Sequence, residues 1–141
     1  MLAFTSCHPL FCVWDMGYDH VNRNNEGSAV GKYILTKYSK KMMEYEGGYK
    51  NIPNSIIDLK ADGSYAITNA PDWVTESFGI SRQTYFDKNG KWFFTCDESS
   101  YILELDGFQS GEMIYEKAHK RVILLTVGDP DSCQGMVYEK Q

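Results

Sequence analysis

Residues 56–68, with the sequence IIDLKADGSYAIT, decide the fold class of this 141-residue chain. Before the dipeptide Asp62-Gly63, Ile57 and Leu59 alternate with polar neighbours, and residues 64–68 alternate again after it. Alternation with a period of two indicates a half-buried β-strand, because successive side chains of a strand point to opposite faces. Asp-Gly accepts the positive φ angles that both central positions of a type I′ turn require. The stretch therefore predicts a pair of antiparallel strands joined by a two-residue hairpin turn.

The same pattern continues downstream. Residues 83–88 and 91–96 flank Asn89-Gly90, which predicts a second hairpin with the same kind of turn. Residues 101–106 alternate again before Gly107. Residues 121–127, in the last third of the chain, are apolar on both faces, which predicts a central strand covered on both sides. The remaining strands are expected over residues 32–38, 112–117, 121–127 (the segment apolar on both faces) and 135–140.

About nine short strands with a turn signal roughly every 8–12 residues favour an all-β fold. The meander of hairpins favours a small antiparallel up-and-down barrel of about eight to nine strands. A sandwich is the alternative, because turn chemistry does not give the strand order. The best helical candidate, residues 38–45, has a poor amphipathic pattern and is equally compatible with a strand extension or a loop.

Composition points to one ordinary globular domain. Apolar residues make up 43% and charged residues 23% of the chain, and the net charge is −5. A chain of this length buries enough surface to form a core without disulfides or a metal. The acidic balance argues against a nucleic-acid partner, because such binding depends on neutralising phosphates. No apolar run is long enough for a membrane-spanning helix.

The first thirty residues lack this alternation. We expect residues 1–30 to form an irregular N-terminal segment and residues 31–141 to form a single β-domain. The start of the chain, LAFTSC at residues 2–7, resembles the end of a bacterial lipoprotein signal, in which small residues precede an acylated cysteine. Lipidation of Cys7 is one interpretation. The other is an ordinary apolar segment that packs on the domain.

Nucleophilic and metal-binding side chains form no recognisable constellation. The cysteines Cys7, Cys12, Cys96 and Cys133 include no Cys-x-x-Cys pair and match no zinc spacing. Their pairing is open, and buried free thiols are the simpler interpretation. A nucleophile formed by Cys133 with His119 would need an electropositive niche that nothing in the sequence indicates. We therefore expect no enzyme activity, no cofactor and no metal site.

Five short motifs resemble those of a set of small uncharacterised bacterial proteins, many of them predicted lipoproteins, that have a lipocalin-like β-barrel. The motifs are GKY (31–33), LKADGSY (59–65), NAPDW (69–73), GDPDS (128–132) and MVYEK (136–140). The resemblance covers residues 31–140 and departs at Cys133, where a glycine is expected. It implies a bacterial origin, a location in the cell envelope or periplasm and no known enzyme activity. The cytoplasm is the alternative location.

The leading functional hypothesis is a non-enzymatic protein-binding domain. One form of it is an immunity protein that neutralises a bacterial toxin by occluding a basic toxin domain, since complementary charge speeds association. Binding residues concentrate in connections between strands. The expected partner-binding residues are Asp72, Trp73, Glu76, Asp97, Glu98, Asp129 and Asp131. Within this set Trp73 has a second interpretation, as a plug that closes one end of the barrel.

The alternative function is a carrier or sensor of a small apolar ligand in the cell envelope. A barrel of this size can hold one ligand in its mouth. The cavity would then be lined by Tyr33, Tyr65, Phe94 and Tyr101. A filled core would place the same four residues in ordinary packing, and an enzyme that uses Cys133 or His119 ranks below both hypotheses.

Overall fold

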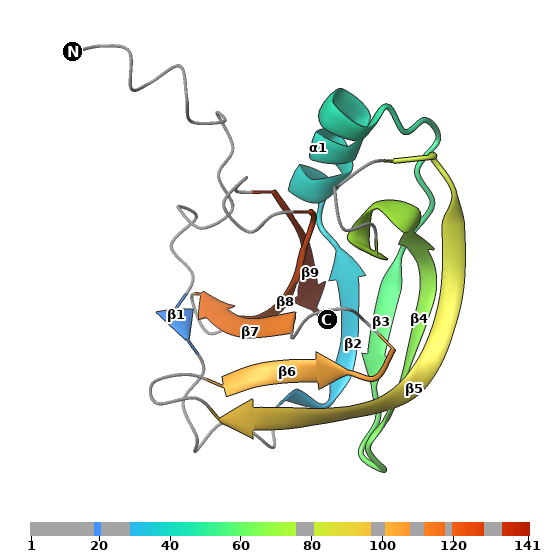
Figure 1. Ribbon diagram of the computed structural model, residues 1–141. Helices are drawn as coiled ribbons and strands as arrows, with labels where there is room; N and C mark the ends of the chain where they lie inside the picture. The colour runs from blue at the N-terminus through green and yellow to red at the C-terminus, as the bar shows by residue number, and fades with distance from the viewer. Residues whose placement is uncertain are drawn as a thin grey trace, which may run out of the picture.

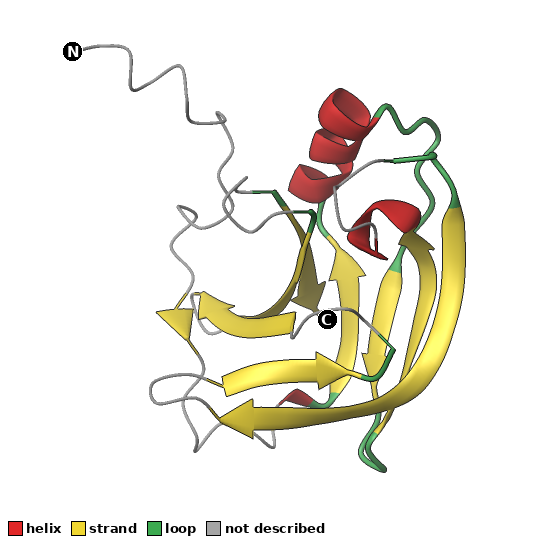
Figure 2. Cartoon of the chain, in the orientation of Figure 1, coloured by secondary structure: helices red, strands yellow, loops and turns green. Residues whose placement is uncertain are grey.

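Antiparallel strands dominate the computed structural model, which describes residues 19–20, 29–75, 81–96, 101–107, 112–117, 120–128 and 134–141 (Figure 1). The strands are β1 (Asp19–His20), β2 (Gly31–Leu35), β3 (Ile56–Leu59), β4 (Ser64–Pro71), β5 (Tyr85–Cys96), β6 (Tyr101–Leu105), β7 (Glu112–Lys117), β8 (Lys120–Thr126) and β9 (Gly135–Lys140). The helix α1 (Lys37–Gly47) follows β2, and the short 3-10 helix η4 (Asp72–Thr75) follows β4. Figure 2 shows α1 and η4 toward the same end of the curled sheet.

The described strands form one antiparallel sheet. From β2 to β9 each strand pairs with the next strand in sequence, and β9 also pairs with β2. The order is β1-β7-β6-β5-β4-β3-β2-β9-β8, with a further pairing between β7 and β8. The sheet therefore curls strongly around one core, as Figure 1 shows. The prediction of an antiparallel, predominantly β fold is confirmed, and the segment expected to be irregular contributes the short strand β1.

The β3–β4 hairpin forms where residues 56–68 predicted it, with Leu59 opposite Tyr65. Its turn differs from the expected two-residue type. The Lys60 N–H donates to the Ser64 carbonyl (2.9 Å), and the Gly63 N–H donates to the Lys60 carbonyl (3.1 Å). Gly63 has a φ of 88°, whereas Asp62 is not in the left-handed region. The connection is therefore a three-residue turn whose last position favours glycine.

The hairpin predicted at Asn89-Gly90 is wrong, because β5 runs without interruption through both residues. Gly90 lies opposite Tyr65 in the sheet and is not in the left-handed region. A Cβ at Gly90 would lie 3.0 Å from Cε1 of Tyr65 and 3.2 Å from the Asp106 carbonyl oxygen. Glycine is needed here so that a neighbouring aromatic ring can cross the strand, and not to form a turn.

The ambiguous candidate at residues 38–45 is a helix, and the strand before it ends at Leu35. The Thr36 side chain caps the helix by accepting a hydrogen bond from the Ser39 N–H (3.2 Å), and Gly48 ends it in the left-handed conformation. The buried Ser39 hydroxyl in turn accepts a hydrogen bond from the Val137 N–H (2.8 Å), which fastens α1 to β9. End caps rather than an apolar stripe therefore define this helix.

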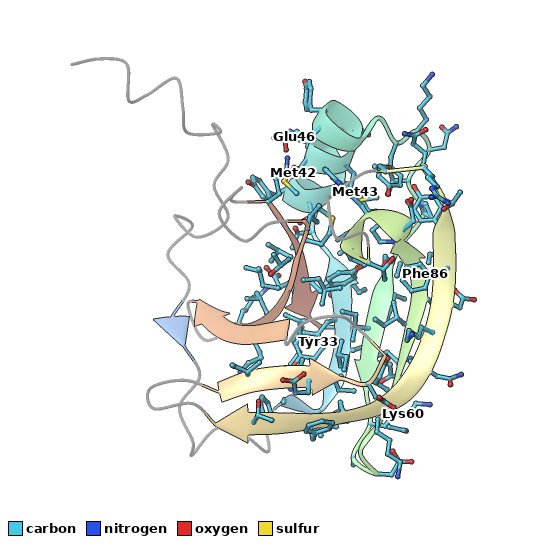
Figure 3. The ribbon with its side chains drawn as sticks, in the orientation of Figure 1. Tyr33, Met42, Met43, Glu46, Lys60 and Phe86 are labelled. Carbon is cyan, nitrogen blue, oxygen red and sulfur yellow. The ribbon has the colours of Figure 1, made fainter. Side chains whose placement is uncertain are left out.

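The core lies inside the curl of the sheet. Figure 3 shows Tyr33 within it and Met42 and Met43 reaching toward it from α1. Strand β8 is buried on both faces, as its apolar pattern predicted, since Val122 and Leu124 are as inaccessible as Ile123 and Leu125. The most deeply buried large side chains are Trp73, Tyr33, Tyr65, Tyr138, Met43, Ile57, Leu59, Ile67, Leu103, Ile123 and Leu124.

Candidate functional site

Trp73 lies in η4, at the helical end of the sheet, and is only 2% exposed. Its ring packs against that of Tyr49, with ring centroids 6.1 Å apart. Gly47 at the end of α1 leaves room for both rings, because a Cβ there would lie 2.7 Å from Tyr49 and 3.2 Å from Trp73. Trp73 therefore occupies the position of a plug, and the side chain is not displayed for a partner.

Asp72 organises the connection that carries this plug. Its carboxylate accepts hydrogen bonds from the Tyr49 hydroxyl (2.5 Å), the Arg82 N–H (2.7 Å) and the Thr84 N–H (3.2 Å). Burial, together with the hydrogen bond to Asp72, raises the pKa of Tyr49 above its ordinary value. Asp72 is thus tied to the backbone of its own loop, which limits what it can offer to a partner.

The other predicted contact residues are not placed by the structure. The backbone of Tyr101 lies in β6, but its side chain is outside the described residues. The remaining acids and the candidate lipidation site also lie outside them, so their roles stay predictions: Glu76, Asp97, Glu98, Asp129, Asp131 and Cys7.

Two of the predicted cavity-lining tyrosines, Tyr33 and Tyr65, belong to the packed core. Tyr33 is fully buried, and its hydroxyl donates to the Ala29 carbonyl (2.5 Å). Tyr65 is also buried, and its hydroxyl donates to the Asp106 carbonyl (2.5 Å). Both hydroxyls are therefore satisfied by main-chain acceptors. Burial raises the pKa of Tyr33, so the phenol stays neutral inside the sheet.

Phe94 has a different environment from the two tyrosines. It is half-buried and makes an edge-to-face contact with Trp92, with ring centroids 5.8 Å apart. Both rings pack against the edge of the core. The Trp92 indole N–H donates to the Lys60 carbonyl (2.9 Å), which fixes its ring at the β3–β4 turn.

The outer face of β5 and β6 carries the exposed aromatic residue that the sequence analysis missed. Phe93 is 52% exposed and lies directly opposite Glu104. Trp92 and Phe94 pack against the core, and successive strand side chains point to opposite faces, so Phe93 faces outward. We call the residues around it the Phe93 surface: Lys91, Phe93, Thr95, Ile102, Glu104 and Asp106.

The Phe93 surface has an apolar centre and a charged rim. The Thr95 hydroxyl donates to a Glu104 carboxylate oxygen (3.4 Å), which holds that acid beside Phe93. Asp106 is exposed at the end of β6, and its N–H donates to the Lys91 carbonyl (2.9 Å). The other strongly exposed aromatic residue of the described chain is Tyr45 on α1, which is 84% exposed.

Metal and membrane sites are not evident in the part of the chain that the structure describes. No group of three or more His, Cys, Asp or Glu side chains is placed to bind a metal ion among these residues. None of the described helices has the length and hydropathy of a membrane span. Comparison with protein-family models, with curated proteins and with solved structures finds no match to this chain.

Proposed function

We propose that this protein is a non-enzymatic protein-binding domain that acts through the outer face of its sheet. The burial of side chains that would otherwise line a cavity supports this proposal. Tyr33 and Tyr65 donate their hydrogen bonds to the main chain, and Trp73 closes the helical end, so these side chains serve the fold. Among the described strand residues, the large apolar side chain that is exposed is Phe93, in a surface whose rim carries Glu104, Asp106 and Lys91.

The sheet itself fits a lipocalin-like up-and-down barrel of eight strands, β2 to β9. Its support is the pairing of every strand with its sequence neighbour and of β9 with β2. In an arrangement of this kind the interior is just wide enough for side chains to fill it. If side chains occupy the interior of such a barrel, a partner protein is bound by its outer face and its loops.

The partner that fits this surface is a basic protein with an apolar contact site. The chain carries a net charge of −5, and the rim of the Phe93 surface has two acids, Glu104 and Asp106, against one cation, Lys91. Asp97 and Glu98, which follow β5 in sequence, stay predicted contact residues. One form of this function is an immunity protein that occludes a basic toxin domain, placed in the cell envelope or periplasm, with Cys7 as a lipid anchor.

The test is purification of the protein from its native cells, followed by reconstitution of the complex from purified components. We expect a stoichiometric complex with a basic protein whose association slows as salt rises, because acidic residues steer the encounter. Reversal of Asp106, an exposed acid of the Phe93 surface, to lysine should weaken that complex and leave the thermal midpoint nearly unchanged. A preparation that contains only a small apolar molecule would contradict the proposal.

A second candidate function, a carrier of a small apolar ligand, is favoured by one observation. Trp92 and Phe94 are only half-buried although they pack toward the core side of β5. They are the residues at which an apolar molecule would enter. Native mass spectrometry of the protein from its source cells separates the two functions, because a carrier retains a bound small molecule and a protein-binding domain does not.

A further inference from the structure

Strand β5 extends well beyond the end of β6, toward the helical end of the sheet (Figure 1). Strand β6 pairs with residues 92–96 of β5, and the Asp106 N–H adds one hydrogen bond to the Lys91 carbonyl (2.9 Å). Past Lys91, no described strand pairs with this side of β5, whereas β4 pairs with the other side as far as Tyr85. Residues 85–90 therefore form an edge of the described sheet, which we call the β5 edge.

The chain turns away from this edge at Gly107. Continuing the register of β5 and β6 by two residues sets Gly107 opposite Gly90. Gly107 has a left-handed φ of 93°, a conformation that ends a strand. By Glu112 the chain has reached the other side of β6, where Glu112 pairs with Leu103. Neither β6 nor β7 therefore pairs with the β5 edge.

The main-chain groups of the β5 edge alternate between the β4 side and the open side. The Trp92 N–H donates to the Gly63 carbonyl (2.8 Å), so the even-numbered residues of β5 point their main chain toward β4. In an antiparallel pair the intervening residues point the other way, as the Lys91 carbonyl does toward β6. The edge residues whose N–H and C=O groups point to the open side are Tyr85, Asp87 and Asn89.

The charge of Asp87 decides which strand can add to this edge. Asp87 and Asn89 are exposed, and Oδ1 of Asp87 accepts a hydrogen bond from the Asn69 N–H (2.8 Å), which fixes the carboxylate. A second copy of the chain that paired through all three open residues would set the two Asp87 carboxylates directly opposite each other. Like charges in that position destabilise a strand pair. The edge therefore disfavours a second copy and favours a strand with a cation opposite Asp87.

We propose that the β5 edge binds an extended segment of the basic partner protein by strand addition. This inference rests on the proposed function, because it names a second way in which that partner attaches. Main-chain hydrogen bonds to Tyr85, Asp87 and Asn89 supply the affinity, and side chains supply the specificity. A lysine or arginine lies opposite Asp87, and an apolar residue lies beside Phe86, which is half-buried against the core. The recognised pattern is an alternation of cationic and apolar residues.

The test is a titration of the isotope-labelled full chain with the capped synthetic peptide TKVKVKT, followed through the amide signals of β5. The matched control peptide is TEVEVET, which keeps the valines and reverses the charges. TKVKVKT should shift the signals of Tyr85, Asp87 and Asn89 and slow their hydrogen exchange, because their N–H groups become bonded. TEVEVET should bind at least about tenfold more weakly. No change at these three residues up to millimolar TKVKVKT, or equal binding of both peptides, would overturn the proposal.

Matched substitutions show whether the edge itself binds the peptide. Asn89→Pro removes an N–H that points to the open side and leaves the pairing with β4 in place, whereas Asn89→Ala keeps that N–H. Affinity for TKVKVKT should be at least about fivefold weaker in Asn89→Pro than in Asn89→Ala. If Asn89→Pro does not fold, Asp87→Asn decides, because it keeps the acceptor for Asn69 and should abolish the preference for TKVKVKT over TEVEVET. Equal affinities of the Asn89 variants, or an unchanged preference in Asp87→Asn, would overturn the proposal.

Strand addition and the proposed function fail separately. The peptide titration uses no partner protein, so its result stands even if Phe93→Ala does not weaken binding of the partner, which contradicts the proposed function alone. A partner that binds through Phe93 but leaves hydrogen exchange at Tyr85, Asp87 and Asn89 unchanged contradicts strand addition alone.

Discussion

Two glycines show that the same residue type can be required for opposite reasons. Gly63 adopts a left-handed conformation, and a Cβ there would meet nothing within 4 Å. Gly90 has an ordinary strand conformation, but a Cβ would press against Tyr65 and the Asp106 carbonyl. The first requirement is conformational, and the second is steric.

Matched substitutions separate the two requirements. We expect Gly63→Ala and Gly90→Ala each to lower the free energy of unfolding by about 1 kcal/mol or more. Gly63→Asn should recover most of the loss, because asparagine tolerates the left-handed region, whereas Gly90→Asn should be worse than Gly90→Ala. Denaturant midpoints measure both pairs. Equal responses to asparagine at the two positions would contradict this assignment.

The sequence predicted local features of the chain well and contact-dependent ones poorly. The alternation of residues 56–68 is set within one hairpin, so the β3–β4 pair was predicted correctly. The role of Gly90 depends on Tyr65, which is 25 residues earlier in the chain. Asn89-Gly90 therefore looked like a turn, although its glycine accommodates a ring from another strand.

At the scale of elements, the helical end of the sheet depends on η4 and the end of α1. Trp73 was ambiguous in the sequence, because a tryptophan in a connection can be displayed or buried. Only its contacts with Tyr49 and Gly47 decide that it is buried. The weak apolar pattern of helix α1 likewise did not distinguish it from a strand or a loop. Its caps, Thr36 and Gly48, identify it better.

Removal of the plug should destabilise the molecule strongly. Trp73→Ala is expected to cost about 3–5 kcal/mol, the range for truncation of a large buried aromatic residue. Arg82→Ala is the control in the same connection, because Asp72 bonds the Arg82 backbone N–H and not its side chain. Chemical denaturation compares the two variants. A loss below 1 kcal/mol for Trp73→Ala would show that the side chain is not a core residue.

At the scale of the whole molecule, the buried tyrosines predict the response of stability to alkaline pH. Burial raises the pKa of Tyr33, Tyr49 and Tyr138 above the ordinary value of 10.0. A group whose pKa is raised by folding contributes stability that is complete below its unfolded pKa and is lost as pH rises above it. Stability should therefore decline above about pH 10 as the unfolded tyrosines ionise.

Tyr138→Phe tests the tyrosine contribution to this decline. The variant loses the hydrogen bond that the Tyr138 hydroxyl shares with Ser55 (2.7 Å), so its stability at neutral pH should fall by about 1 kcal/mol. Its decline above pH 10 should nevertheless be shallower than that of the unmodified protein, because one titrating phenol is gone. Unfolding midpoints between pH 8 and pH 11.5 measure both effects. Parallel curves would rule out Tyr138 as a contributor.

The central proposal is that this protein binds a protein partner through the Phe93 surface on the outer face of its sheet. Calorimetric titration of the purified partner into Phe93→Ala, with Tyr45→Ala as the matched control, tests it most directly. Both substitutions remove an exposed aromatic ring and should leave the fold intact. The account predicts that Phe93→Ala weakens binding at least about tenfold, as a central aromatic contact does, while Tyr45→Ala binds as the unmodified protein. Equal affinity of all three proteins would contradict the claim.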